Sequence, residues 1–459
     1  MILKITSKYW IPRIPRGIRL YFKLMATGGT KPYTWSFVSG NLPTGVNVSP
    51  AGIVSGFVSQ IGTFKFKVQL KDRTNKKIIK EFGIVIYENT KMAHMCGYGN
   101  EGQLSNYISG VGSKLITLRG VLNNVNQIAL GYVNAAAIKN DGTLWTWGSN
   151  SAGQLGNGNR RSRSSPVQTI ALGNNWKQIS CGLDFMAAIK NDGSLWTWGS
   201  NTVGQLGNNR SASKNGGLYE ESRPFPIQTV CKTFDWKQVS CGWELAAAIK
   251  NNGTLWVWGS NFFGGLGNNK YTTSIIPNDK SSPIQTIAGG TNWKQVSCGS
   301  HFNAAIKTDG SLWLWGRNYN GQLGDNTTID RSSPVQTIAG GKNWKYVSTG
   351  NEHTAAIKND GSLWCWGKNN HGQLGDNTTV NKSSPVQTIS FGAKWKEVSC
   401  GYYHTFGIKE NYTLWGWGKN SEGQLGLGKL PNQSIPTIVG ANWQKISCFG
   451  YASGAIKKD

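Results

Sequence analysis

A short element, Trp-x-Trp-Gly, recurs six times along this chain of 459 residues. Its first tryptophans lie mostly about 51 residues apart, at Trp145, Trp196, Trp256, Trp313, Trp364 and Trp415. Self-similarity at a period of this size is typical of solenoids and propellers, in which every repeat is one small structural unit. The repeat therefore limits the fold more strongly than length or composition does.

Each repeat contains four segments with the properties of short β-strands. In the repeat that holds Trp196, the first strand is predicted at residues 176–182 and the second ends at Lys190. Asn-Asp-Gly then supplies a tight turn, because Asn and Gly accept a positive φ. The third strand follows at 195–199, where the two tryptophans point to one face since side chains alternate, and the fourth contains residues 226–229. Four strands per repeat predict a propeller blade.

Two incomplete repeats lie at the two ends of the repeat region. Residues 96–104 resemble a third strand with no first or second strand before it. Residues 443–448 and 454–457 resemble a first and a second strand with nothing after them. We expect these parts to form a seventh blade together, because such pairing removes exposed sheet edges. The prediction is an all-β chain whose residues 91–459 form a seven-bladed β-propeller closed by pairing of its N- and C-terminal strands.

The repeat also resembles a known family. Asn-Asp-Gly-Ser-Leu-Trp-Thr-Trp-Gly at residues 191–199, followed by Gly-Gln-Leu-Gly at 204–207, is similar to the signature of the chromosome-condensation-regulator family, also called the α-tubulin-suppressor-like repeat. The resemblance covers about residues 91–459 and implies the propeller fold. The family is known for a nuclear member that exchanges guanine nucleotide on a small GTPase and binds chromatin. Many bacterial and viral relatives have no such role, so the fold alone does not fix the function.

Residues 1–90 lack the repeat and alternate apolar and polar residues between turns that contain Gly or Pro. This pattern predicts a small β-sandwich. The segments 26–35, 41–45, 52–56 and 62–68 resemble the immunoglobulin-like or cadherin-like modules of bacterial surface proteins and phage structural proteins. We therefore expect an Ig-like domain in front of the propeller.

The chain is strongly basic, with a formal net charge of +26 and a pI near 9.7. Residues 1–90 carry 14 Lys and Arg against 3 Asp and Glu. Arg13, Arg16 and Arg19 stand where related modules are more neutral. A positive field favours nucleic acid, anionic glycans, lipid headgroups or acidic proteins as partners. A solvated basic surface without any ligand is the simpler alternative.

Five of the eight cysteines occupy the same position in their repeats: Cys181, Cys241, Cys298, Cys400 and Cys448. We expect equivalent positions on different blades to lie beyond the Cα separation of about 7 Å that a disulfide allows. The sequence holds no Cys-x-x-Cys pair, which a zinc site often requires. We therefore expect buried free thiols, and we predict neither a metal nor a cofactor.

The sequence holds no recognisable catalytic pattern. His353 and His404 occupy a repeat position that elsewhere holds Phe or Leu, which favours packing over metal binding or catalysis. A nucleophile elbow, a phosphate-binding loop and a pair of carboxylates at a useful spacing are all missing from the sequence. We predict no catalytic residues and no enzymatic activity.

Repeat and sandwich motifs account for 19 of the 21 tryptophans, and only Trp10 and Trp243 fall outside them. Tryptophan-rich chains often bind sugars, but this count favours a structural role for most of the rings.

Residues that break the repeat are the candidates for binding a partner, because loops carry function more often than packed strands do. They include a compact basic loop, an insertion at residues 211–223 and a Phe-Phe pair that replaces polar residues before Gly-Gly-Leu. Together with the basic residues of the first domain, the candidate partner-binding residues are Arg160, Arg161, Arg163, Phe262, Phe263, Arg13, Arg16 and Arg19.

The leading functional hypothesis is a non-catalytic structural or interaction protein of a virus particle, such as a phage tail, fibre or capsid appendage. The Ig-like domain, the bacterial style of the repeats and the lack of a cleavable signal peptide favour it. Its partners would be a virion scaffold or a host surface receptor, with an anionic glycan or nucleic acid as a further ligand of the basic surface. A homo-oligomer would suit such a protein.

Two alternatives stand beside it. One is a guanine nucleotide exchange factor or chromatin-binding regulator in the cell, and the other is a lectin-like adhesin at the cell surface. No stretch approaches the roughly 20 apolar residues that span a bilayer, so no membrane-spanning segment is expected.

Overall fold

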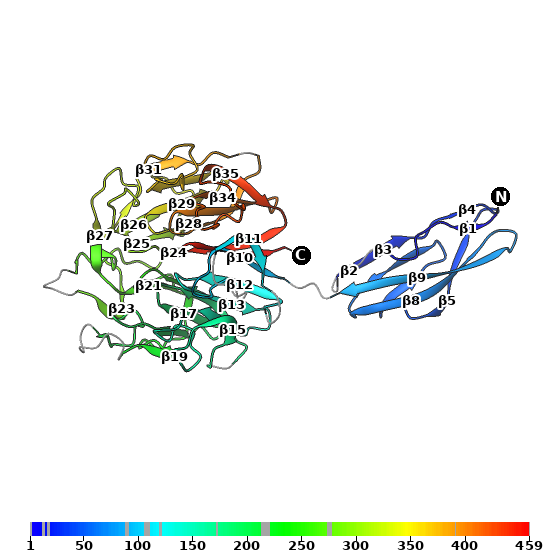
Figure 1. Cartoon of the computed structure of the whole chain (residues 1–459), viewed down its shortest axis with the longest axis horizontal. Helices are drawn as coiled ribbons and strands as arrows, with labels where there is room; N and C mark the ends of the chain where they lie inside the picture. Colours follow the sequence, from blue (N-terminus) through cyan, green and yellow to red (C-terminus); the bar gives the residue numbers. More distant parts are fainter. Residues whose placement is uncertain are drawn as a thin grey trace. The chain divides into compact units, whose positions relative to one another are not determined.

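The computed structural model describes residues 2–11, 14–15, 19–87, 91–104, 111–118, 122–170, 173–212, 221–272, 278–390 and 392–458. The chain divides into two compact units, Met1–Thr90 and Lys91–Asp459. The regular secondary structure of both units is almost entirely β-strand (Figure 1). Within the described ranges, no helix has the length and apolar character needed to cross a membrane.

The smaller unit holds nine described strands: β1 (Lys4–Ile5), β2 (Ile14–Pro15), β3 (Arg19–Lys23), β4 (Ala26–Thr27), β5 (Thr34–Gly40), β6 (Val46–Val48), β7 (Ile53–Phe57), β8 (Gly62–Lys71) and β9 (Lys77–Tyr87). They form a four-stranded sheet in the order β2-β9-β8-β5, a three-stranded sheet in the order β3-β7-β6 and the pair β1-β4.

Alternation along β8 gives this unit its core. Phe64, Phe66 and Val68 are buried, whereas Lys65 and Lys67 between them are exposed. The buried side chains pack in one hydrophobic cluster with residues of both larger sheets. One face of the four-stranded sheet is therefore apolar and covered, and the other face carries lysines.

The larger unit holds seven four-stranded sheets among its described residues. The first strands are β12 (Val125–Leu130), β16 (Trp176–Cys181), β20 (Trp236–Cys241), β24 (Trp293–Cys298), β28 (Trp344–Thr349), β32 (Trp395–Cys400) and β36 (Trp443–Phe449). The second strands are β13 (Asn134–Lys139), β17 (Phe185–Lys190), β21 (Leu245–Lys250), β25 (Phe302–Lys307), β29 (His353–Lys358), β33 (His404–Lys409) and β37 (Ala452–Lys457).

The third strands are β10 (Ala93–Tyr98), β14 (Leu144–Gly148), β18 (Leu195–Gly199), β22 (Leu255–Gly259), β26 (Leu312–Gly316), β30 (Leu363–Gly367) and β34 (Leu414–Gly418). The fourth strands are β11 (Val111–Thr117), β15 (Arg163–Gln168), β19 (Arg223–Gln228), β23 (Lys280–Gln285), β27 (Arg331–Gln336), β31 (Lys382–Gln387) and β35 (Gln433–Gly440). A short 3₁₀ helix, η1 (Phe262–Gly264), follows β22.

One sheet joins strands from both ends of this unit, in the order β11-β10-β37-β36. Strand β10 pairs antiparallel with β37 in a register that places His94 opposite Ala455 and Cys96 opposite Ser453. The C-terminal strands accordingly lie beside β10 and β11 in Figure 1. The two incomplete repeats of the sequence thus share one sheet.

Polar side chains of the first strands fasten each sheet to the next. The Oγ of Ser240 accepts a hydrogen bond from the N–H of Cys298 at 3.0 Å. The Gln238 amide makes two bonds to Val296, donating to its carbonyl oxygen at 3.0 Å and accepting from its N–H at 3.1 Å. These side chains hydrogen-bond to the neighbouring backbone much as an adjacent strand would.

The same kind of hydrogen bond, from a backbone N–H to a serine Oγ, also joins β12 and β36, the first strands nearest the two ends of this unit. The Oγ of Ser447 in β36 accepts from the N–H of Leu130 in β12 at 3.2 Å. A cavity of about 210 Å³ is lined by residues from all seven first strands. The first strands therefore surround a common space, and much of its lining is Gln and Ser.

Tryptophan rings from the first and third strands pack against one another, away from the cavity that the first strands surround. Trp176 contacts Trp196 and Trp198 edge-on, with ring centroids 6.5 and 6.1 Å away. The Nζ of Lys190 lies 4.9 and 4.4 Å from the ring centroids of Trp176 and Trp196, within range of cation–π attraction. The same two-ring contact recurs at Lys250, Lys307, Lys358 and Lys409. Part of the basic charge is therefore structural.

One strand begins earlier than the sequence pattern predicts. Strand β19 begins at Arg223, three residues before the predicted start, because residues before a proline favour extended backbone and an outer strand tolerates proline.

All eight cysteines are free, and seven of them are buried. Burial raises the pKa of Cys298 to about 12, and its Sγ donates to the carbonyl of Ser240 at 3.3 Å.

Candidate protein-binding face

A tight turn joins the first strand of each sheet to the second, and neighbouring turns pack against one another. The N–H of Gly242 donates to the carbonyl of Leu245 at 2.9 Å and closes one such turn. A Cβ on Gly242 would lie 2.2 Å from the carbonyl oxygen of Gly299, which begins the turn of the next sheet. Only a residue without a Cβ allows this approach. The side chains that follow these glycines are therefore brought together at one end of the sheets.

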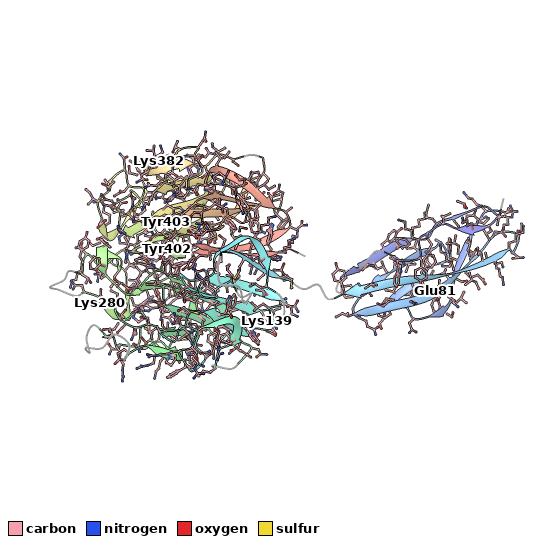
Figure 2. The ribbon with its side chains drawn as sticks, viewed as in Figure 1. Glu81, Lys139, Lys280, Lys382, Tyr402 and Tyr403 are labelled. Carbon is pink, nitrogen blue, oxygen red and sulfur yellow. The ribbon has the colours of Figure 1, made fainter. Side chains whose placement is uncertain are left out.

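Aromatic rings of these turns form a cluster that we call the collar: Tyr132, Trp243, His301, Tyr402, Tyr403 and Tyr451. The Tyr402 ring stacks on that of Tyr132 with centroids 5.3 Å apart and lies 5.3 Å from that of Tyr451. The Trp243 ring lies 6.1 Å from that of Tyr402. Tyr402 is 6% exposed, and the other collar rings are half-buried. Figure 2 shows Tyr402 and Tyr403 near the centre of the larger unit.

Three cations stand on one side of the collar, each directly after a third strand: Arg317, Lys368 and Lys419. The Glu352 carboxylate pairs with Arg317 at 3.1 Å and with Lys368 at 2.7 Å. The Nζ atoms of Lys368 and Lys419 lie 5.1 and 5.9 Å from the ring centroid of Tyr403. Because Glu352 balances one charge of the three, this side of the collar is positive.

The other side of the collar carries two carboxylates, Asp184 and Glu244. Together with Trp243 they line a pocket of about 130 Å³. Burial raises the pKa of both carboxyls, and the neighbouring charges of Asp279 and Asp184 raise the pKa of Glu244 further. Gln154 donates its Nε2 hydrogen to Asp184 at 3.1 Å. This side of the collar is suited to a cationic group, which the Trp243 ring would also attract.

The histidines at this face are neutral at physiological pH. Burial lowers the pKa of His301 to about 4 and the pKa values of His353 and His404 to about 3. The Nε2 atoms of His353 and His404 are hydrogen-bonded to the hydroxyls of Thr405 at 3.0 Å and Ser453 at 2.8 Å. Such rings act by packing rather than by charge. Among the described residues, no group of three or more His, Cys, Asp or Glu side chains is placed to hold a metal ion.

One predicted pair of residues extends the collar. The Phe263 ring lies 5.4 Å from that of His301, and the Arg317 guanidinium lies 5.1 Å from the Phe263 ring centroid. Phe262 beside it is 48% exposed. Phe263 adopts a positive φ of 58°, a strained value for an aromatic residue, and this turn places its ring against His301.

The predicted basic loop is not part of the contacts that define the collar. Arg160, Arg161 and Arg163 are exposed and lie in the loop that leads into β15 and at the start of that strand. The Asn150 side chain holds this loop, because its Nδ2 donates to the carbonyl of Arg161 at 3.1 Å. Residues 213–220 of the predicted insertion lie outside the described residues.

The predicted arginines of the first domain belong to the smaller unit. Arg19 is the exposed first residue of β3 and borders a pocket of about 470 Å³ with Phe57. Arg13 and Arg16 lie outside the described residues.

Sequence reasoning missed most of the collar. Tyr132, Trp243 and Tyr402 directly follow the turn glycine of their repeats, a position where other repeats hold Leu183, Ser300 or Asn351. His301 and Tyr403 occupy the next position, where other repeats hold Asp184, Glu244 or Glu352. The available signal was the placement of Trp243 outside the repeat motif, in a position that varies between repeats.

Comparisons with known proteins agree with this architecture. The sequence model of the RCC1-like domain matches residues 83–387 and 220–459, and a model of an Ig domain matches residues 17–87. The chain is 32% identical over 301 residues to the ultraviolet-B receptor UVR8 of Arabidopsis thaliana, a match that covers 65% of this chain and 66% of the receptor. It is 30% identical over 352 residues to the mitochondrial RCC1 domain-containing protein RUG3 of the same plant, covering 68% and 75%.

The match to larger relatives is partial. The human E3 ubiquitin-protein ligase HERC2 is 28% identical over 323 residues, which is 68% of this chain but 6% of the ligase. The chain thus spans just under two thirds of UVR8 and a small part of HERC2.

Two solved structures share the fold. Human WBSCR16 superposes with a TM-score of 0.70 at 22% identity, covering 80% of this chain and 99% of that one. Prp20p of Saccharomyces cerevisiae superposes with a TM-score of 0.70 at 18% identity, covering 81% and 92%. At these identities the likeness concerns the fold alone.

The prediction of a virion component, located in a virus particle, is wrong. The curated relatives named above are cellular proteins: a plant ultraviolet-B receptor, a plant mitochondrial protein and a human E3 ubiquitin-protein ligase. The features that favoured a virion were an Ig-like module and the style of the repeats. Both describe scaffolds that many unrelated functions share, so they carry no information about a virus particle.

Proposed function

Because the chain belongs to the RCC1-like domain family, we propose that it is a regulatory protein that acts by binding a partner protein at the collar. Yeast Prp20p binds Gsp1p and histones. We assign this chain to the same class of function, a guanine nucleotide exchange factor or chromatin-binding regulator. It would change the state of its partner through contact, without catalytic residues of its own.

The proposed architecture behind this function is a closed ring of seven blades. Two observations support closure: the bond from Leu130 to Ser447, and a cavity lined by all seven first strands. In a closed ring every blade lies between two neighbours, so the turns are held in fixed positions. The collar would thus present a surface that is already organised before a partner arrives, which reduces the ordering entropy lost on binding.

The single observation that carries the proposal is the composition of the collar. Tyrosine, tryptophan and arginine are the residues most often found at the energetic centres of protein interfaces. Here Trp243, Tyr403 and Arg317 meet on one face although they come from different sheets. The three side chains are half-buried, so they lose little freedom on binding and still offer area to a partner.

The charges at the collar are distributed unevenly, with cations on one side and carboxylates on the other. Arg317, Lys368 and Lys419 lie on one side, and Asp184 and Glu244 lie on the other. A partner with a matching pair of patches would bind in one orientation, since complementary charge sets register and speeds association.

The proposal is tested with purified small GTPases loaded with a fluorescent guanine nucleotide and with core histones. Binding of the full chain is measured by biolayer interferometry, and nucleotide release is followed by fluorescence. Trp243→Ala should weaken binding roughly 30-fold and Tyr403→Ala roughly tenfold, as expected for buried interface anchors. Phe234→Ala is the matched control, because this ring is 63% exposed in the connection at the opposite end of the sheets.

The outcomes separate clearly. Equal affinity of wild type and both collar variants, with loss in Phe234→Ala, would place the binding face at the other end of the sheets. No binding to any GTPase and no binding to histones would overturn the assignment to this class.

A further inference from the structure

The smaller unit has a charged face that the proposed function does not use. The outer face of the sheet β2-β9-β8-β5 carries Lys65, Lys67 and Lys71 from β8. In β8 these lysines alternate with buried Phe66 and Val68, so their side chains project away from the core. Residues two apart on a strand lie about 6.6 Å from each other on one face. We call this surface the lysine face.

The lysine face carries more positive than negative charge. Lys67 pairs with Glu81 of β9, the one described carboxylate on this face. Lys71 pairs directly with Lys77 of β9, and like charges in that arrangement repel each other. The structure gives Lys65, Lys67, Lys71 and Lys77 no ion-pair partner among the described residues. The net positive charge of this face is therefore available to an external anion.

The two described carboxylates of this unit are already engaged. Asp72 is 3% exposed and accepts hydrogen bonds from the backbone N–H groups of Thr30, Thr74 and Lys76, at 2.9 to 3.0 Å. These hydrogen bonds, of which the one from Thr30 has the largest effect, hold the pKa of Asp72 below its ordinary value. Glu81, which Figure 2 labels, accepts from the Tyr9 hydroxyl at 2.7 Å.

An exposed indole stands beside these lysines. Trp10 is 47% exposed and forms a parallel bridge with Gly83, which lies opposite Lys65. A Cβ at Gly83 would lie 2.3 Å from the Trp10 ring, so the ring covers the glycine closely. The Tyr9 ring meets it edge-on at 5.1 Å. The indole is thus fixed in place with part of its surface open to solvent.

We propose that the lysine face binds single-stranded nucleic acid, with the lysines contacting phosphates and a base stacking on Trp10. Proteins that bind single strands combine a basic surface with fixed aromatic rings in this way. An acidic protein would use the lysines but has no base to stack on the indole. An anionic glycan also lacks an aromatic base, and the comparison with heparin distinguishes it from a nucleic acid. In a duplex the bases are already stacked on one another, so the indole would find no free base face.

The test is fluorescence anisotropy of a labelled 20-residue oligothymidylate titrated with the full chain over a range of salt concentrations. Trp10→Ala should weaken binding roughly tenfold, as loss of one stacked base does. Lys67→Gln should also weaken binding and reduce the slope of log K against log salt by about 0.7. Tyr21→Ala and Lys23→Gln are matched controls on β3, where Tyr21 is 70% exposed, and both should bind like wild type.

Several results would overturn the proposal. Equal losses in the two β3 controls, or no effect of Trp10→Ala beside a clear effect of Lys67→Gln, would show attraction by net charge alone. Equal affinity for heparin or for a duplex of the same length would do the same.

Two further measurements guard against misfolding. Trp10→Phe keeps a ring on Gly83 and should retain most of the affinity. Photocrosslinking of an iodouracil-substituted strand to the wild-type chain should label the peptide that contains Trp10, whereas labelling confined to β3 would contradict the proposal. The collar variants Trp243→Ala and Tyr403→Ala should leave this binding unchanged, so the two proposals fail independently.

Discussion

The first strand of each sheet and the turn directly after it have opposite relations to the repeat. The strand reads Trp-Lys-Gln-Val-Ser-Cys or a close variant in most sheets, whereas the turn holds a different set of residues each time. In the strand, Gln238 and Ser240 bond to the backbone of the next sheet. In the turn, the side chains of Trp243 and Tyr403 are only half-buried, so part of each ring is exposed to solvent.

This difference teaches how to interpret a repeat protein. A residue that joins one sheet to the next must recur, because every sheet meets a neighbour in the same geometry. A residue that meets a partner is under no such constraint, since a partner touches each sheet differently. Repetition therefore indicates structural contacts, and departures from it at one end of the sheets indicate the binding surface.

The sharpest contrast is between two tryptophans. Trp366 is fully buried and donates its Nε1 hydrogen to the carbonyl of Gln322 at 2.9 Å. We expect Trp366→Ala to lower the free energy of unfolding by about 3–5 kcal/mol. Trp243→Ala should lower it by about 1 kcal/mol, because the ring is half-buried and little would be left empty. Guanidinium denaturation of the full chain measures both, and similar losses would contradict the division into structural and binding rings.

The next effect concerns a position where the strand itself departs from the repeat. Glu397 stands where four of the other first strands hold Gln, and it accepts a hydrogen bond from the N–H of Ile446 at 3.2 Å. Burial raises the pKa of Glu397 from 4.5 to about 7. Protonation is thus favoured by folding, so its contribution is full below about pH 4.5 and is lost as the pH rises through about 7.

Glu397→Gln should remove this dependence and introduce the amide found in four of the other sheets. We expect the variant to exceed wild type by about 2 kcal/mol at pH 8, with a small difference at pH 4.5. Unfolding free energies at the two pH values test this, and Glu410→Gln, an exposed position, is the control. A constant difference between the two pH values would contradict the assignment.

A smaller effect is expected for the serine bonds. Ser297 accepts from the N–H of Thr349 at 3.0 Å, the contact that recurs between neighbouring first strands. Ser297→Ala leaves that N–H without its partner and should reduce the unfolding free energy by about 1–2 kcal/mol. Ser333→Ala removes an exposed side-chain contact and should change it by less than about 0.5 kcal/mol. Equal values would remove the special role of the serine position.

The smallest expected change in stability distinguishes lysines that pack on tryptophan rings from lysines beside the collar. Lys190 lies between two tryptophan rings, as do its equivalents in four other sheets. Lys190→Met keeps the apolar stem, loses the charge and should reduce stability by about 0.5–1 kcal/mol. Lys419→Met, beside the collar, should leave stability unchanged and slow association with the partner. Thermal unfolding and association rates measured on the same samples decide between the two roles.

Much of the fold could be predicted from the sequence because the signal is repeated. The turn at 191–193, the paired tryptophans of β18 and the shared sheet of β10 and β37 all follow from local chemistry or from matching incomplete repeats. The start of β19 could not be placed, because its first residues carry no alternation.

The candidate sites were harder to predict. Phe263 was identified as a departure from the repeat, and it contacts the collar ring of His301. Tyr132 and Tyr402 lie 270 positions apart in the chain, so only the arrangement of the sheets shows that they stack. The tryptophan count carried more information than expected, because Trp10 and Trp243, the two rings outside every motif, lie at the two proposed binding surfaces.

The central claim is that a partner protein binds at the collar end of the sheets. The most direct measurement places a photocrosslinking phenylalanine derivative at position 403 in one sample and at position 234 in another, followed by irradiation with the bound partner and mass spectrometry. We predict crosslinks from position 403 and none from position 234. Crosslinks to the same partner from position 234 alone would contradict the account.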